Sequence, residues 1–180
     1  MISDVCVFSL FSFFFFLANF NFLGDDFAFT LGVLQLSVSG LFYLGARERI
    51  KYDPFWGNMN IIFAFFFGVF GGVTNILIGL SFSLNELILA IPNVVIGLLM
   101  LLSTRGVKDN PLTFFLIWIF AWIGVLSLGL GGCGLEPVFF NKLGGIGLLG
   151  VAILGFYAQI AFMHIHAGIN MSLGKQLFKN

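Results

Sequence analysis

The stretch that decides the fold is LTFFLIWIFAWIGVLSLGLG, which runs from Leu112 to Gly131 without a charged residue. A helix of roughly 20 apolar residues crosses the ~30 Å hydrocarbon core of a bilayer, because its backbone hydrogen bonds are all internal. Cutting the rest of the chain at its charges and prolines leaves five more such stretches. The six predicted spans are Val5–Leu23, Phe27–Ala46, Gly57–Gly79, Glu86–Ser103, Leu112–Gly131 and Lys142–His164.

The composition of the whole chain predicts the same class of protein. Charged residues make up 9% of the 180 residues and hydrophobic residues 59%, whereas soluble domains carry about 25% charged residues. The ten-residue stretches of alternating polarity that build transmembrane barrels are missing. No linker, charged tail or repeat divides the chain. We therefore predict an all-α membrane protein whose six helices form one bundle and one domain over residues 1–180.

The lysines and arginines predict the orientation of this bundle. The joints after the second and fourth spans and the two termini hold seven of the eight basic residues, namely Arg47, Arg49, Lys51, Arg105, Lys108, Lys175 and Lys179. The other side holds Lys142 together with Asp25, Asp26, Glu86 and Glu136. Because cytoplasmic loops are enriched in Lys and Arg, we expect a multi-pass protein of the inner or plasma membrane. Both termini would then be cytoplasmic and the outer face acidic.

Residues with chemical reactivity are sparse. Cys6 and Cys133 fall at opposite membrane surfaces, too far apart to form a disulfide. His164 and His166 are two positions apart and point to different helix faces, which is a poor arrangement for a metal. The sequence contains no serine–histidine–aspartate set, no paired catalytic carboxylates and no phosphate-binding loop. We therefore expect no enzyme activity, no metal site, no cofactor and no nucleic-acid partner.

Uncharged polar residues at membrane depth are the most informative feature for function. A primary amide facing lipid is costly, so each amide must contact another helix or a polar path. Any one of them can act as hydrogen-bonding glue between helices, and that alternative stays open. A set drawn from five spans can instead converge on a path for a small solute. The residues that we expect to line or border such a path are Asn19, Gln35, Asn60, Asn93, Tyr157 and Gln159.

Two segments resemble the acetate uptake transporters, which include the bacterial succinate-acetate permeases. The run Gly32-Val33-Leu34-Gln35, followed by Gly40, is similar to the second span of that family. The glycine-rich run from Gly144 to Gly147, with Phe156-Tyr157-Ala158 after it, is similar to the sixth. The resemblance implies a homohexamer in the lipid bilayer, in which every subunit has its own pore for a small monocarboxylate such as acetate. It also implies an apolar, aromatic constriction midway, near which we place Phe16, Phe63 and Phe67.

Two further hypotheses remain beside this one. The segments Asn75–Leu80, Asp109–Pro111 and Ile117–Trp122 resemble the middle of the urea and amide channel family, and an acidic outer face would favour a neutral solute or the protonated acid over an anion. A channel for urea, amides or ammonia is therefore the first alternative. The second is a membrane subunit of a larger complex that transports nothing, in which every amide is interhelical glue.

Overall fold

The computed structural model describes residues 2–24 and 27–176, whose regular elements are all helical. In chain order they are α1 (Ile2–Asn19), α2 (Phe27–Arg49), α3 (Pro54–Phe63), the π-helix η1 (Ala64–Phe70), α4 (Gly71–Gly79), α5 (Leu87–Leu102), the 3-10 helix η2 (Ser103–Val107), α6 (Leu112–Gly132) and α7 (Pro137–His166). The prediction of an all-α protein is confirmed. Because α3, η1 and α4 follow one another without a gap, they form one helical rod over residues 54–79.

The number of spans is confirmed in part. Among the described residues, five helical stretches are long and apolar enough to cross a membrane, and they cover residues 27–49, 54–79, 87–107, 112–132 and 137–166. The apolar part of α1 over residues 5–19 is shorter than these five. The helix was predicted to continue to Leu23, but Asn21 adopts a left-handed conformation with φ 56°, and the chain turns there. The sixth span therefore stays a prediction.

Other helix ends also differ from the prediction. The last helix begins at Pro137 rather than Lys142, because a proline at the first helical position gives up no hydrogen bond. The second continues past Ala46 to Arg49. At the start of α3 the aspartate before Pro54 caps the helix, since Asp53 Oδ1 accepts a hydrogen bond from the Trp56 backbone N–H at 3.1 Å. The length of an apolar stretch does not by itself show where a cap or a proline starts or ends the helix.

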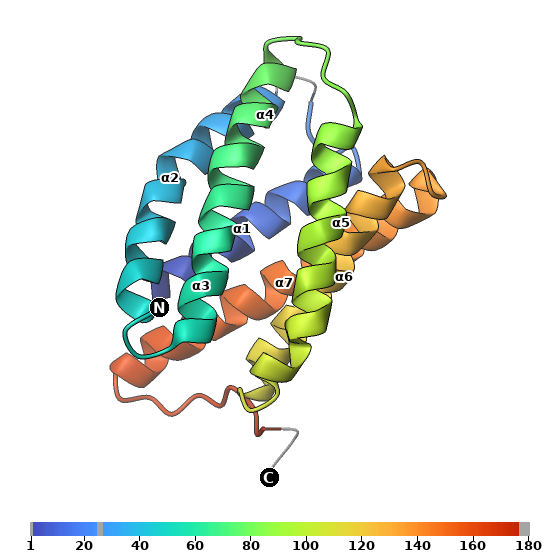
Figure 1. Ribbon diagram of the computed structural model, residues 1–180. Helices are drawn as coiled ribbons and strands as arrows, with labels where there is room; N and C mark the ends of the chain where they lie inside the picture. Colours follow the sequence, from blue (N-terminus) through green and yellow to red (C-terminus); the bar gives the residue numbers. More distant parts are fainter. Residues whose placement is uncertain (1, 25–26, 177–180) are drawn as a thin grey trace.

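The helices pack closely against one another within the chain. As Figure 1 shows, α2 lies beside the α3–η1–α4 rod, while α1 and α7 cross behind them, and α6 packs between α5 and α7. Glycines permit these approaches. A Cβ on Gly32 of α2 would stand 2.6 Å from the Gly72 carbonyl oxygen, and one on Gly147 of α7 would stand 2.9 Å from Gly124 Cα. These glycines thus serve helix packing within one chain.

The bundle has two chemically different ends. The basic end comprises residues 47–54, residues 103–111 and the C-terminal segment, residues 167–176, which runs from the end of α7 back to the start of α6 (Figure 1). There the Thr113 backbone N–H and hydroxyl both donate to the Leu173 carbonyl oxygen, at 3.1 and 2.7 Å. The acidic end comprises residues 80–86 and 133–136. Asp25, Asp26 and Lys179, which also entered the charge prediction, lie outside the described residues.

The orientation of these ends can be tested by cysteine labelling. In a variant lacking Cys6 and Cys133, Arg105→Cys and Glu136→Cys would place single thiols on exposed residues of the basic and the acidic end. Because Lys and Arg concentrate in cytoplasmic loops, we expect an impermeant maleimide to label the second thiol in intact cells and the first only after permeabilisation. The opposite pattern would reverse the orientation, and labelling of both thiols from outside would exclude it.

Candidate functional site

Three cavities lie in series through the bundle. The largest, here the basic-end cavity, has a volume of about 250 Å³, and residues of α1, α2, α3, α5, α6, α7 and the C-terminal segment line it. The middle cavity measures about 30 Å³ and the acidic-end cavity about 90 Å³. Because one water needs roughly 10–15 Å³, the end cavities can hold several waters or a small solute, and the middle one only about two or three waters.

Aromatic rings separate neighbouring cavities. Phe8, Phe42 and Phe63 line both the basic-end and the middle cavity. Phe15, Phe67 and Leu148 line both the middle and the acidic-end cavity. Three of these rings contact one another, because the Phe8 centroid lies 5.4 Å from that of Phe63 and 5.6 Å from that of Phe67, and the last two are 5.6 Å apart. The middle of the series is therefore a narrow aromatic constriction.

The π-helix η1 contributes Phe67 to this constriction. Its wider turn shifts the backbone hydrogen-bond register by one residue, a feature that is frequent at functional sites. The carbonyl oxygen of Phe67, inside this segment, accepts a hydrogen bond from Gln35 Nε2 at 2.6 Å. Gln35 Oε1 in turn accepts one from Asn75 Nδ2 at 2.7 Å. Gln35, only 1% exposed, thus joins α2 to both η1 and α4 beside the acidic-end cavity.

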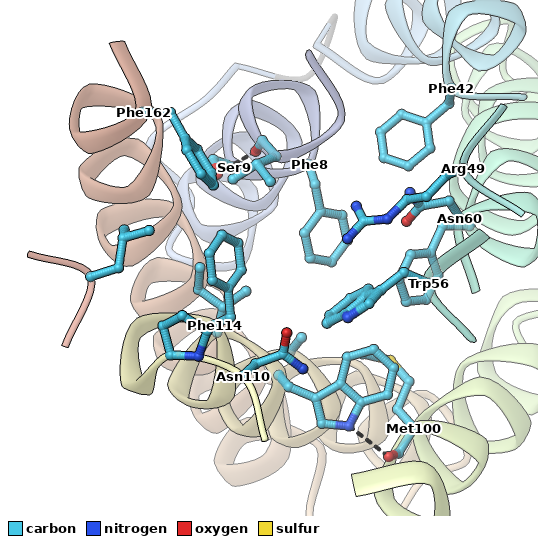
Figure 2. A pocket seen from close by; sticks show the side chains of 17 residues that line it. Phe8, Ser9, Phe42, Arg49, Trp56, Asn60, Met100, Asn110, Phe114 and Phe162 are labelled. Atoms are coloured by element: carbon cyan, nitrogen blue, oxygen red, sulfur yellow. Dashed lines mark hydrogen bonds between the residues drawn. The ribbon is translucent and has the colours of Figure 1, made fainter. Parts of the chain in front are cut away.

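The basic-end cavity combines aromatic walls with a few polar groups. Figure 2 shows Arg49 reaching into it from α2, on the side where Asn60 and Trp56 lie. Ser9 and Asn110 line other parts of the wall, and their side chains donate hydrogen bonds to the Val5 and Val107 carbonyl oxygens. Such a cavity can surround the apolar part of a small solute and offer its polar part a cation and amides.

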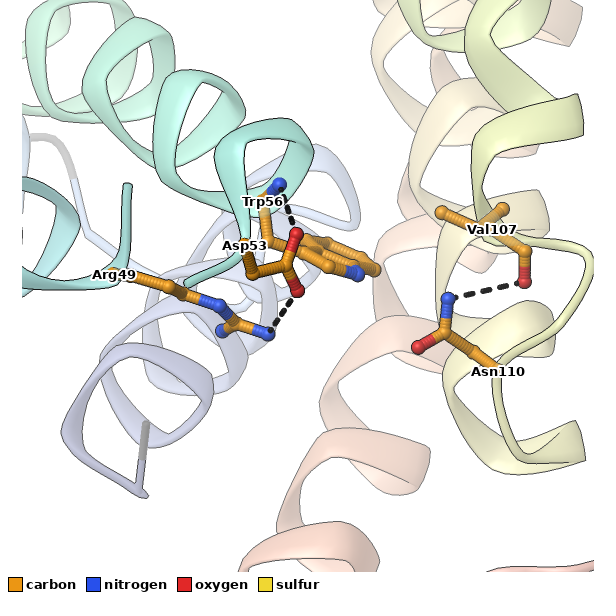
Figure 3. Close-up of polar contacts among 5 residues, drawn as sticks. All are labelled: Arg49, Asp53, Trp56, Val107 and Asn110. Carbon is orange, nitrogen blue, oxygen red and sulfur yellow. Dashed lines mark hydrogen bonds and ion pairs between the residues drawn. The ribbon is translucent and has the colours of Figure 1, made fainter. Parts of the chain in front are cut away.

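Arg49 is incompletely paired in this cavity. One of its nitrogens, Nη2, lies 3.7 Å from Asp53 Oδ2, which is too long for a hydrogen bond (Figure 3). The guanidinium carbon lies 5.4 Å from the centre of the Trp56 ring. Its Nε is buried without a hydrogen-bond partner among the described residues, and the side chain is 15% exposed. Arg49 therefore keeps hydrogen-bonding capacity beside the cavity.

The structure gathers some of the predicted path residues and separates others. Gln35 and Asn93 line the acidic-end cavity, and Asn60 lines the basic-end cavity. Phe63 and Phe67 stand at the two boundaries of the middle cavity. The remaining predicted residues, which line none of these three cavities, are Asn19, Tyr157, Gln159 and Phe16.

The residues away from the cavities make other contacts. Asn19 Nδ2 donates to the Phe15 carbonyl oxygen of its own helix, and its side chain packs against Gly145 of α7. Tyr157 donates its hydroxyl proton to the Ser172 carbonyl oxygen, which ties down the C-terminal segment. The ring of Phe16 packs against other rings of the α1 region, those of Phe13, Phe20 and Phe22. Gln159 buries its side-chain oxygen without a hydrogen-bond partner in the described part of the chain.

Two important lining residues, Phe8 and Arg49, were not predicted. Phe8 is one of several phenylalanines in the first span, and their spacing does not identify the ring that meets Phe63. Arg49 was counted only as a loop charge, because the second span was expected to end at Ala46. The helical turn from Ala46 to Arg49 carries the guanidinium to the cavity wall.

Among the described side chains, those of residues 5–24 and 27–176, no three His, Cys, Asp or Glu residues gather in a way that could hold a metal ion. Comparison with protein-family models, with curated proteins and with solved structures finds no match for the chain. The cavities are therefore the feature of the molecule that bears on function.

Proposed function

We propose that the chain is a membrane channel or transporter for a small monocarboxylate such as acetate. The observation that carries the proposal is the series of three cavities, which adjoin through shared lining residues and lie within one chain. A solute would enter one end cavity, lose most of its water at the Phe8, Phe63 and Phe67 rings, and regain polar contacts in the other. An apolar constriction of this kind slows large solutes and interrupts a continuous file of water.

The character of the polar groups supports a small, singly charged or neutral solute. Arg49 provides one cation at the basic end, and uncharged amides provide the polar groups further along, with Asn60 in the first cavity and Gln35 and Asn93 in the last. None of the described residues that line the three cavities carries a carboxylate, although proton pumps and cation transporters normally place one at membrane depth. A monocarboxylate needs one cation and a short apolar pocket, and the basic-end cavity has both.

A channel for urea, amides or ammonia is the second candidate. The observation that favours it is the lining of the middle and acidic-end cavities, whose described residues include rings, amides and hydroxyls but no charged side chain. After leaving the basic end, an anion would lose contact with Arg49, the one cation among the described lining residues. A neutral solute needs no cationic partner.

The proposal includes a homohexamer in the bilayer. All three cavities are formed by residues of a single chain, so every subunit would hold its own path. Large apolar side chains such as Leu41, Val95 and Ile153 are more than half exposed on the outer surface of one chain, where either lipid or neighbouring subunits can cover them.

Uptake into proteoliposomes tests the proposal directly. Purified protein would be reconstituted, and the entry of labelled acetate, succinate, urea and ammonium would be compared at neutral pH, where acetic acid is almost fully ionised. We expect acetate to enter at least about tenfold faster than into protein-free liposomes, which corresponds to a barrier lowered by ~1.4 kcal/mol. Succinate should enter more slowly because it carries a second charge past the rings.

The other outcomes separate the alternatives. Urea or ammonium entry without acetate entry would favour the neutral-solute channel. If no solute enters, and the protein co-purifies with a fixed set of other chains, the non-transporting subunit is favoured and the proposal is wrong.

A further inference from the structure

The most unusual group in the basic-end cavity is the guanidinium of Arg49. It is one cation on the wall of a cavity of about 250 Å³, it is mostly buried, and its Nε–H has no acceptor in the described part of the chain. A buried donor without a partner costs free energy, and a buried charge costs more. These costs are reduced if the arginine binds an anionic acceptor.

We propose that Arg49 is the residue that binds the carboxylate of the solute and makes the path prefer anions over neutral molecules of the same shape. This inference rests on the proposed function, because it assigns a substrate contact along the same series of cavities. Arginine fits the role because its planar fork can donate two parallel hydrogen bonds to one carboxylate.

The surroundings hold the guanidinium ready for such a ligand. Trp56 lies under it, with the guanidinium carbon 5.4 Å from the ring centre, and cation–π attraction at that distance orients the cation. Figure 2 shows the tip of the side chain directed into the cavity, in the direction of Phe8. The remaining wall is mainly apolar, which suits the methyl group of a short-chain acid.

Asp53 acts as an internal competitor for the same cation. Its Oδ2 lies 3.7 Å from Nη2, whereas charge-assisted hydrogen bonds are about 2.7–2.9 Å long. The pair is therefore loose, and the Asp53 side chain is 36% exposed. A small carboxylate that approaches the guanidinium at full hydrogen-bond distance would compete favourably with this pair. The loose pair thus permits both binding and release of the anion.

The test uses two substitutions with opposite expected effects. Arg49→Gln removes the cation and should weaken acetate binding about tenfold or more, because a charge-assisted hydrogen bond is lost. Asp53→Asn removes the competing charge and should strengthen acetate binding. Asparagine keeps the side-chain oxygen that caps α3, so this variant should fold normally. The matched control is Arg47→Gln, which removes an exposed cation from the same end of α2.

Binding and transport are measured separately on the full chain. Trp56 and Trp118 both line the cavity, so titration with acetate in detergent at constant ionic strength should change their fluorescence, and titration with the neutral analogue acetamide should change it much less. In proteoliposomes, Arg49→Gln should lower the ratio of acetate to acetamide uptake while acetamide uptake persists. That persistence would also show that the variant is folded.

Several outcomes would overturn the inference. They are an absence of saturable acetate binding in the unmodified chain, unchanged acetate binding in Arg49→Gln, or an equal loss in Arg47→Gln. Failure of the proposed function looks different, because acetate would then not cross the membrane at all, whether or not it binds near Arg49.

Discussion

Replacing Phe63 with alanine is expected to raise acetate flux about tenfold, which corresponds to a barrier lowered by ~1.4 kcal/mol. The Phe63 ring is 5% exposed and stands between the basic-end and middle cavities, where it stacks on Phe8. Removing it would join the two cavities and widen the narrowest part of the series. Uptake of labelled acetate into proteoliposomes, per folded protein, measures this change.

The solute preference should change together with the rate. Butyrate is bulkier than acetate and gains more from a wider constriction, so its uptake relative to acetate should rise in the Phe63→Ala variant. The matched control is Phe65→Ala in the same rod, because that ring is 58% exposed and lines none of the three cavities in series. Equal flux in the two variants would show that Phe63 does not limit transport.

Loss of stability has to be separated from gain of flux. Truncating a buried phenylalanine to alanine costs about 3–5 kcal/mol, which can unfold a marginal protein. Phe63→Leu keeps most of the apolar volume and should show a smaller increase in flux in the same direction. If this milder variant folds and its flux is no higher than that of the unmodified chain, the constriction has been placed at the wrong residue.

The all-helical architecture could be predicted because the length of the apolar runs and the low content of charged residues are read directly from the sequence. An uninterrupted apolar run such as Leu112–Gly131 is stable only in a membrane or in a large protein core. The helix α6 begins at the predicted residue and ends one residue later, at Gly132. The start of α3 also has a local sequence signal, since Asp53-Pro54 contains both the acceptor and the proline that favour a helix start.

The details of the candidate site depend on contacts between distant segments. The segment Ala64–Phe70 has an ordinary apolar composition, and its π-helical turn is supported by Gln35, 32 residues earlier than Phe67 in the chain. Asn19 was expected to border the solute path, but the sequence does not show which neighbouring helix its side chain meets. That neighbour is Gly145 of α7, so Asn19 packs between helices rather than against a cavity.

Gln35→Leu tests whether a buried amide serves packing alone or the solute as well. The change removes the donor to the Phe67 carbonyl oxygen and the acceptor for Asn75 Nδ2, both in the interior. Leaving one such group unsatisfied costs about 1–3 kcal/mol in soluble proteins, and one hydrogen bond between membrane helices contributes ~0.6 kcal/mol on average. We expect the free energy of unfolding to fall by about 1–2 kcal/mol, measured in a denaturant titration in detergent.

The same variant is expected to lose transport, because Gln35 also lines the acidic-end cavity and supports the π-helical segment that carries Phe67. A lost polar contact that raises the barrier by ~1.4 kcal/mol lowers flux about tenfold. Thr74→Val is the matched control, since it deletes a buried hydroxyl that bonds within its own rod, to the Phe70 carbonyl oxygen, and lines none of the three cavities in series.

A double-mutant cycle with Asn75→Leu separates the two roles of Gln35. Because Gln35 and Asn75 share a hydrogen bond, their effects on stability should be less than additive. Flux per folded protein should fall in each single variant and stay unchanged in Thr74→Val. If Gln35→Leu lowers stability but moves acetate as fast as the unmodified chain, the amide holds helices together and the solute path runs elsewhere.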